Sequence, residues 1–207
     1  MASFTHCWKS ARLSLALLLA ALLLCPVATQ AQPAPAEIVQ FRLEHSDEGV
    51  FLSAQMKFEL SSAVQVALQK GITVYFVAEA QLLRNRWYWT DKKLATATRH
   101  TRLNYLPLTR RWRIIATHGA AAGSSSGMTL NQEFESLEEA LSALSRLSHW
   151  KIAEAADVDP EVHHNVDFGF RLDLSALPRP FQIGILGQTE WAVSVSKNQR
   201  LEPEAAK

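Results

Sequence analysis

The sequence has 207 residues, 48% of them hydrophobic, and its 21 Lys or Arg nearly balance its 20 Asp or Glu, so the net charge is unremarkable. Both cysteines, Cys7 and Cys25, lie near the amino terminus. The rest of the chain has no thiol, which excludes disulfides, thiol catalysis and thiolate metal sites from it.

The first 31 residues are typical of a secretory signal peptide. Lys9 and Arg12 supply a positive start, residues 13–24 are apolar apart from one serine, and Pro26 then breaks the hydrophobic stretch. A dozen apolar residues fall short of the roughly 20 that a membrane-spanning helix needs, which favours a cleaved signal over an uncleaved anchor. We therefore expect an exported, periplasmic protein.

Thr29 and Ala31 have the spacing that a signal peptidase accepts, so we expect cleavage after Ala31, with cleavage after Ala28 as the alternative. A lipoprotein is disfavoured because Leu24 precedes Cys25, where a lipid-attachment site requires Gly, Ala or Ser. Processing would leave 19 basic against 20 acidic residues, a net charge of −1.

The expected organisation after the signal is a spacer, one β-rich domain and a polar tail. Gln32 to Ala36 alternates Pro and Ala and can neither continue a helix nor complete a strand ladder. About 175 residues are ample for one hydrophobic core, so we assign residues 37–197 to a single domain. Residues 198–207 form the predicted tail.

Two alternating segments, residues 39–44 and 50–58, predict a β-hairpin around the turn-forming Ser46-Asp47-Glu48-Gly49. Ser61 or Ser62 then caps a predicted short helix that ends at Lys70-Gly71.

From Ile72 to Leu82 apolar and polar residues alternate again, which predicts a strand that extends toward Trp87-Tyr88-Trp89. Residues 94–106 and 110–117 predict two more strands, so the three form an antiparallel meander. Residues 119–127, which are Gly, Ala and Ser only, predict a flexible loop.

A capping box at Ser136 to Glu139 begins the second predicted helix. Its apolar stripe consists of Leu137, Ala140, Leu141, Leu144 and Leu147. Residues 166–174 alternate between apolar and polar, which predicts a strand with one buried and one solvent-exposed face. Residues 181–186 predict a short stretch of strand pairing. Residues 191–195 predict a last strand, which polar residues follow.

These elements predict a mainly β (α+β) fold: an antiparallel β-sandwich or partly closed barrel of about eight strands with two short helices. The pattern leaves the choice between sandwich and barrel open.

The tracts at residues 84–91, 102–113, 170–173 and 177–184, rich in Trp and Arg, resemble an exported proteobacterial family catalogued as domain of unknown function 4390. The resemblance covers essentially the whole chain after the signal. It implies an envelope protein without an assigned activity. Genes of that family often lie near one for a nitrogen-type two-component sensor kinase, so the resemblance implies the extracytoplasmic domain of such a kinase as a partner.

The segment from Arg84 to Arg113 contains nine Lys or Arg but only one acidic residue, Asp91. Guanidinium planes that stack on indoles would make a groove for an anionic envelope component or protein partner, with a peripheral membrane contact. The candidate binding residues are Arg84, Arg86, Trp87, Trp89, Arg102, Arg110, Arg111, Trp112 and Arg113. The alternative is that these arginines pair with acidic residues across neighbouring strands. Export argues against nucleic acid as the partner.

Other chemistry has weaker support. His163, His164 and Asp167 suggest a metal or acid-base site, but adjacent strand residues point to opposite faces, so we expect a solvent-facing strand start instead. Ser124 to Ser126 lack the strand-turn-helix context of a catalytic serine, and no phosphate-binding glycine pattern occurs. We expect neither a cofactor nor an enzyme.

The leading hypothesis is thus a non-catalytic binding or interaction module, an accessory to envelope signalling, that uses the basic meander. The runner-up is a carrier of an apolar or lipid ligand, lined by the stripes at residues 74–82 and 166–174.

Overall fold

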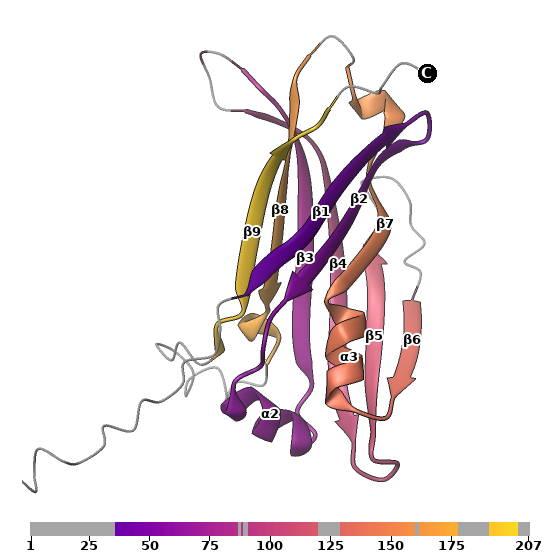
Figure 1. Ribbon diagram of the computed structural model, residues 1–207, viewed down its shortest axis with the longest axis vertical. Coiled ribbons are helices and arrows are strands. Elements are labelled where there is room, and N and C mark those ends of the chain that lie inside the picture. Colours follow the sequence, from indigo (N-terminus) through magenta and orange to yellow (C-terminus); the bar gives the residue numbers. More distant parts are fainter. Residues whose placement is uncertain are drawn as a thin grey trace, which may run out of the picture. The chain divides into compact units, whose positions relative to one another are not determined.

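The computed structural model describes residues 36–86, 88, 91–119, 129–159, 162–177 and 191–202. All of them belong to the unit formed by residues 33–207. The described residues form two antiparallel sheets, two α-helices and two short 3₁₀ turns (Figure 1). Within these ranges, none of the helices has the length and hydropathy that crossing a membrane requires.

The smaller sheet has three strands in the order β1-β2-β7, and every neighbouring pair is antiparallel. Its strands are β1 (Glu37–Ser46), β2 (Gly49–Lys57) and β7 (Arg146–Glu154).

The larger sheet has six strands in the order β6-β5-β4-β3-β8-β9. These strands are β3 (Val74–Arg84), β4 (Lys92–Leu106), β5 (Arg111–Gly119), β6 (Thr129–Phe134), β8 (His164–Leu172) and β9 (Ser194–Arg200).

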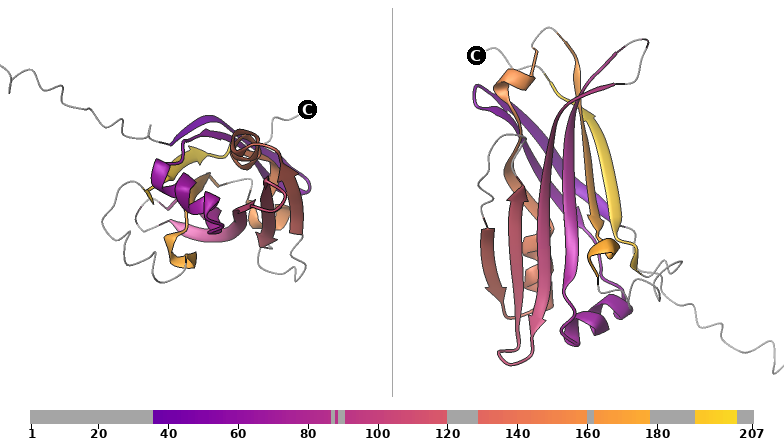
Figure 2. Two further views of the ribbon diagram at one scale, coloured as in Figure 1. Left: turned by 90° about the horizontal axis from the view of Figure 1, so that it is seen from below. Right: turned by 180° about the vertical axis from the view of Figure 1, so that it is seen from behind.

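Two helices accompany the sheets, α2 (Ser62–Gln69) and α3 (Leu137–Leu144). The 3₁₀ turns are η1 (Ala155–Asp157) and η2 (Leu174–Ala176). Helix α2 lies across the end of the sandwich at which β4 turns into β5, whereas α3 leads from β6 of the larger sheet to β7 of the smaller one (Figures 1 and 2).

The core lies between the inner faces of the two sheets. Alternate residues of β2, β3 and β8, such as Leu52, Phe76 and Phe168, are fully buried, as period two requires. Phe58, which follows β2, packs its ring 5.4 Å from that of Phe170 and so joins the two layers. The sheets face each other without closing, which settles the predicted alternatives in favour of an antiparallel β-sandwich.

The predicted first hairpin and the predicted meander are confirmed by the register of β1 with β2 and of β3 with β4 and β5. Ser61 is the N-cap of α2, and its Oγ accepts the Val64 N–H at 3.3 Å. Of the extension predicted beyond β3, Trp87 and Trp89 lie outside the described residues. The predicted loop at 119–127 and brief pairing at 181–186 do too, apart from Gly119, which ends β5.

The second predicted helix is wrong in its last turn. It ends at Leu144, with Ser145 as its C-cap, and Leu147 belongs to β7 instead. In β7, Leu147 pairs with Ala54 and Trp150 with Leu52, so three residues of β7 span two of β2. His149 lies in this bulge and has a φ of 47°. Because of the bulge, Leu147 and Trp150 both point inward although they are three residues apart, which is the spacing of apolar residues on a helix.

Two strands differ from the predicted pattern at the sheet edges. Strand β6 is missing from the predicted elements because its residues are almost all exposed and its alternation is weak. Strand β9 runs to Arg200 rather than ending near Val195, so it includes residues assigned above to the polar tail. Leu201, which follows it, is buried, and its N–H donates to the His164 carbonyl at 2.9 Å.

We predict that Gly49→Ala destabilises the domain by about 1–3 kcal/mol in urea unfolding, because Gly49 has a φ of 137° and a Cβ there would collide with the Ala153 carbonyl oxygen. Gly169→Ala on β8 is the matched control. A Cβ at Gly169 meets nothing within 4 Å, so this change should alter stability by no more than about 1 kcal/mol. Equal losses in both variants would contradict the role assigned to the turn.

Candidate functional site

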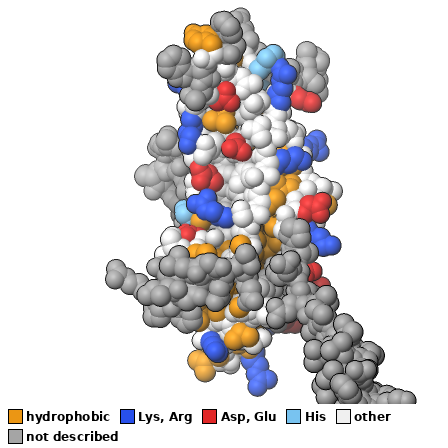
Figure 3. Space-filling view, turned by 90° about the vertical axis from the view of Figure 1, so that its left-hand side faces the viewer, with side chains coloured by type: hydrophobic (Ala, Val, Ile, Leu, Met, Phe, Trp, Pro, Cys, Tyr) orange, Lys and Arg blue, Asp and Glu red, His pale blue; other side chains and the backbone are white. Residues whose placement is uncertain are grey.

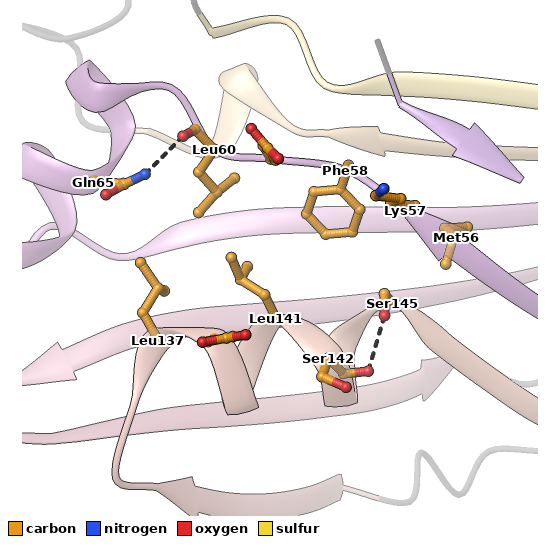
Figure 4. A pocket seen from close by; sticks show the side chains of 11 residues that line it. Met56, Lys57, Phe58, Leu60, Gln65, Leu137, Leu141, Ser142 and Ser145 are labelled. Atoms are coloured by element: carbon orange, nitrogen blue, oxygen red, sulfur yellow. Dashed lines mark hydrogen bonds between the residues drawn. The ribbon is translucent and has the colours of Figure 1, made fainter. Parts of the chain in front are cut away.

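An open groove of about 460 Å³ lies between α3 and the segment that leads from β2 into α2 (Figure 4). Its apolar surface comes from Met56, Phe58, Leu60, Leu137 and Leu141. Its polar surface comes from Lys57, Glu59, Gln65, Glu138, Ser142 and Ser145.

Local hydrogen bonds fix the wall that follows β2. The cap of α2 at Ser61 stops the chain from continuing as a strand, and the Gln65 Nε2 group donates to the Leu60 carbonyl at 2.8 Å. At one end of the groove the Met56 N–H donates to the Ser145 carbonyl at 2.9 Å, which joins β2 to the end of α3. The two walls are therefore held at a set separation.

Helix α3 forms the other wall with one of its two apolar faces. Its N-cap Ser136 accepts the Glu139 N–H at 3.1 Å, as the predicted capping box requires. Ala140 and Leu144 are buried in the core, whereas Leu137 and Leu141 are half-buried and point across the groove toward Leu60 and Phe58 (Figure 4). Leu137 and Leu141 therefore pack against the core only in part and leave apolar surface in the groove.

The groove has the chemistry of a site for an apolar chain. Its floor is hydrophobic, and its rim carries charges of both signs in Lys57, Glu59 and Glu138. The described residues that line it include no histidine, cysteine or aspartate, and its hydroxyl groups are those of Ser142 and Ser145. The stripes predicted to line a lipid cavity, at residues 74–82 and 166–174, pack in the core instead.

The predicted basic cluster divides between the two ends of the larger sheet. Arg84 and Arg86 lie at the end of β3, whereas Arg110 and Arg111 lie where β4 turns into β5. Strand β4 separates these ends with 15 residues, or roughly 50 Å at about 3.3 Å per residue (Figures 1 and 2). The nine cations that are close in sequence therefore do not form one surface.

Arg102 and Arg113 lie near the second of these ends, on the outer face of neighbouring strands, where Arg102 is exposed. Trp112 lies on the opposite face of β5, buried, with its ring 4.8 Å from that of Tyr105. It is a core residue, so the indole that the arginines were expected to stack on points away from them.

Several of these arginines pair with acidic side chains. The Arg113 Nη2 atom lies 2.6 Å from Glu133 Oε1, and Arg111 Nη2 lies 3.3 Å from Glu135 Oε1, both between β5 and the strand or turn beside it. Arg84 Nη2 lies 3.7 Å from Asp159 Oδ2. On the face shown in Figure 3, basic and acidic side chains alternate rather than gather by sign.

His163 and His164 lie on opposite faces of the chain, as predicted, but the expected solvent-facing strand start is wrong for His164. This residue is only 2% exposed, because alternation along β8 puts it on the same face as Val166 and Phe168. Its Nε2 atom is buried without a hydrogen-bond partner. Within the described ranges, no group of three or more potential metal-ligating side chains gathers around it or elsewhere.

Burial lowers the pKa of His164 below its ordinary value of 6.5, and this effect outweighs the opposing influence of the Val162 backbone and Asp159. Arg84 and His45 lower the pKa further. Since the neutral imidazole is favoured in the folded state, protonation opposes folding.

The described residues form a β-sandwich domain with an open groove between a helix and the end of a strand. Residues 34–201 match the family model described as Domain of unknown function (DUF4390), and the chain belongs to that family. No curated protein and no solved structure matches the chain.

We predict that His164 makes the domain less stable in acid. Because its folded pKa lies below its unfolded pKa, the unfolded chain binds more protons below about pH 6.5, so stability is full above that pH and is lost as the pH falls toward the folded pKa. In urea unfolding between about pH 7.5 and 5, His164→Leu should lose less stability than the wild type. His163→Gln, at an exposed site, should keep the wild-type slope; parallel slopes for all three would contradict the prediction.

Proposed function

We propose that this chain is an exported, non-catalytic binding module that carries an apolar chain, such as the acyl chain of a lipid, in the groove between α3 and the β2–α2 segment. The observation that supports this is the groove itself. Its volume of about 460 Å³ lies within the range of about 300–1,000 Å³ that is usual for small-molecule sites.

The groove floor suits an apolar ligand because it continues into the core. Phe58 lines the groove and also packs its ring 5.9 Å from Phe76 and 5.4 Å from Phe170. A ligand bound there would cover Leu137 and Leu141, which remain half-buried in the free domain. Removing this apolar surface from water is the driving force that the proposal requires.

An anionic partner on the basic meander has less support. Its cations lie at two separate ends, and three of them pair with acidic residues that would have to be displaced. The export pattern at the amino terminus supports a periplasmic site of action, where lipids and their acyl chains are abundant ligands.

We predict that Leu141→Trp blocks the groove. The larger side chain would occupy the space of about three methylene groups, each contributing about 0.8 kcal/mol, so affinity should fall by roughly sixtyfold. The measurement is fluorescence titration of the purified chain with N-phenyl-1-naphthylamine, an apolar probe, together with native mass spectrometry of protein taken from the bacterial envelope.

Val66→Trp is the matched control, since Val66 is an exposed apolar residue on α2 that does not line the groove. It should bind the probe as the wild type does. The proposal is overturned if the wild type binds no probe and is always recovered empty, or if both tryptophan variants bind as well as the wild type.

A further inference from the structure

Arg99 points into the protein from the inner face of β4. Along this strand Ala97 and Leu103 are buried and share the face of Arg99, because they lie an even number of residues away. Its partner on β3 is Ala78, another buried residue of the inner face. Arg99 is therefore a cation where the pattern calls for an apolar side chain.

A small hollow between the larger sheet and α3 receives this side chain. Its lining includes the small residues Ala78, Ala116 and Ala143, the apolar Leu144 and the polar Thr101 and Gln132. The space left beside Arg99 is about 20 Å³, which is room for one group the size of a water molecule. The alanines thus make room for a guanidinium and little more.

No acidic side chain occurs among the described residues that line the hollow. The Nε atom of Arg99 is buried without a hydrogen-bond partner, and desolvation lowers the pKa of the guanidinium. Arg84, Arg111 and Arg113, by contrast, each pair with a carboxylate.

We propose that Arg99 is the anchor of a second binding site, one that takes the carboxylate group of a small molecule. A guanidinium offers parallel N–H donors at the spacing of two carboxylate oxygens, and it binds this group more strongly where water is partly excluded. The Thr101 hydroxyl and the Gln132 amide are further polar groups in the wall. One oxygen of the carboxylate fits in the hollow beside the Nε atom, and its negative charge compensates the guanidinium, which the described lining residues do not.

This site is separate from the groove, because α3 stands between them. Leu137 and Leu141 face the groove, whereas Ala143 and Leu144 line the hollow. The carboxylate arrives either alone, as in acetate, or as the head of an acyl chain, as in octanoate. The binding chemistry at Arg99 is the same for both sources. Because the two sites are separate, a negative result at Arg99 does not contradict the proposed function of the groove, and the reverse also holds.

The test is an NMR titration of the full chain, which follows the Nε–H signal of Arg99. Acetate should shift this signal and saturate the shift, whereas acetamide, a neutral molecule of the same shape, should not. Octanoate that binds at least tenfold more tightly than acetate identifies an acyl chain as the source; equal affinities identify the free carboxylate. The proposal is overturned if acetate leaves the Arg99 signal unchanged, or if acetamide moves it as far.

Variants separate binding from folding. Arg99→Met should keep or raise the melting temperature in the absence of acetate, because it removes a partly buried charge that has no carboxylate among the described lining residues, and should abolish the rise that acetate causes in the wild type. Arg102→Met, at an exposed position on the outer face of the same strand, should retain that rise. If Arg99→Met does not fold, Arg99→Lys is the alternative variant. It keeps the positive charge but lacks the parallel N–H donors of the guanidinium, so it should bind acetate at least fivefold more weakly. Wild-type affinity in this variant would overturn the proposal.

Discussion

The path of α3 between the two sheets is the constraint on which the rest of the structure depends. The helix leaves the edge strand β6 of one sheet and delivers the chain to β7, the edge strand of the other (Figure 1). The hydrogen bond from Met56 N–H to the Ser145 carbonyl holds its carboxyl end against β2. A space remains on each of two sides of the helix: the groove, which Leu137 and Leu141 line, and the hollow around Arg99, which Ala143 and Leu144 line.

Much of the fold follows from period two in the sequence, and the exceptions have physical causes. The hairpin of β1 and β2 and the meander of β3 to β5 alternate cleanly because one face of each strand is buried. The boundary between α3 and β7 could not be predicted from the sequence, because the bulge at His149 gives the buried strand residues Leu147 and Trp150 the spacing of apolar residues on a helix. Strand β6 is hidden because an edge strand is held by backbone pairing and by contacts such as Glu133 with Arg113, and not by a buried stripe.

The groove could be predicted only in part. The stripe on α3 is visible in the sequence, but whether Leu137 and Leu141 pack in a core or line an open site depends on what lies opposite them. That surface comes from Phe58 and Leu60, about eighty residues earlier in the chain, and its distance is set by the Met56 to Ser145 bond. Periodicity reports which face of an element is apolar, whereas the partner of that face is a long-range property.

The cations show why position within a strand matters more than density along the chain. Nine Lys or Arg in thirty residues suggested one basic surface, yet a strand of 15 residues carries its two ends far apart, and alternation sends its side chains to two faces. Along β4 the even-numbered Arg102 faces solvent, whereas the odd-numbered Arg99 faces inward with Ala97 and Leu103. An exposed arginine on a β-sheet needs no partner because water solvates it. Arg99 faces inward with no carboxylate among the described residues that line its hollow, so a bound anion would make its position more favourable.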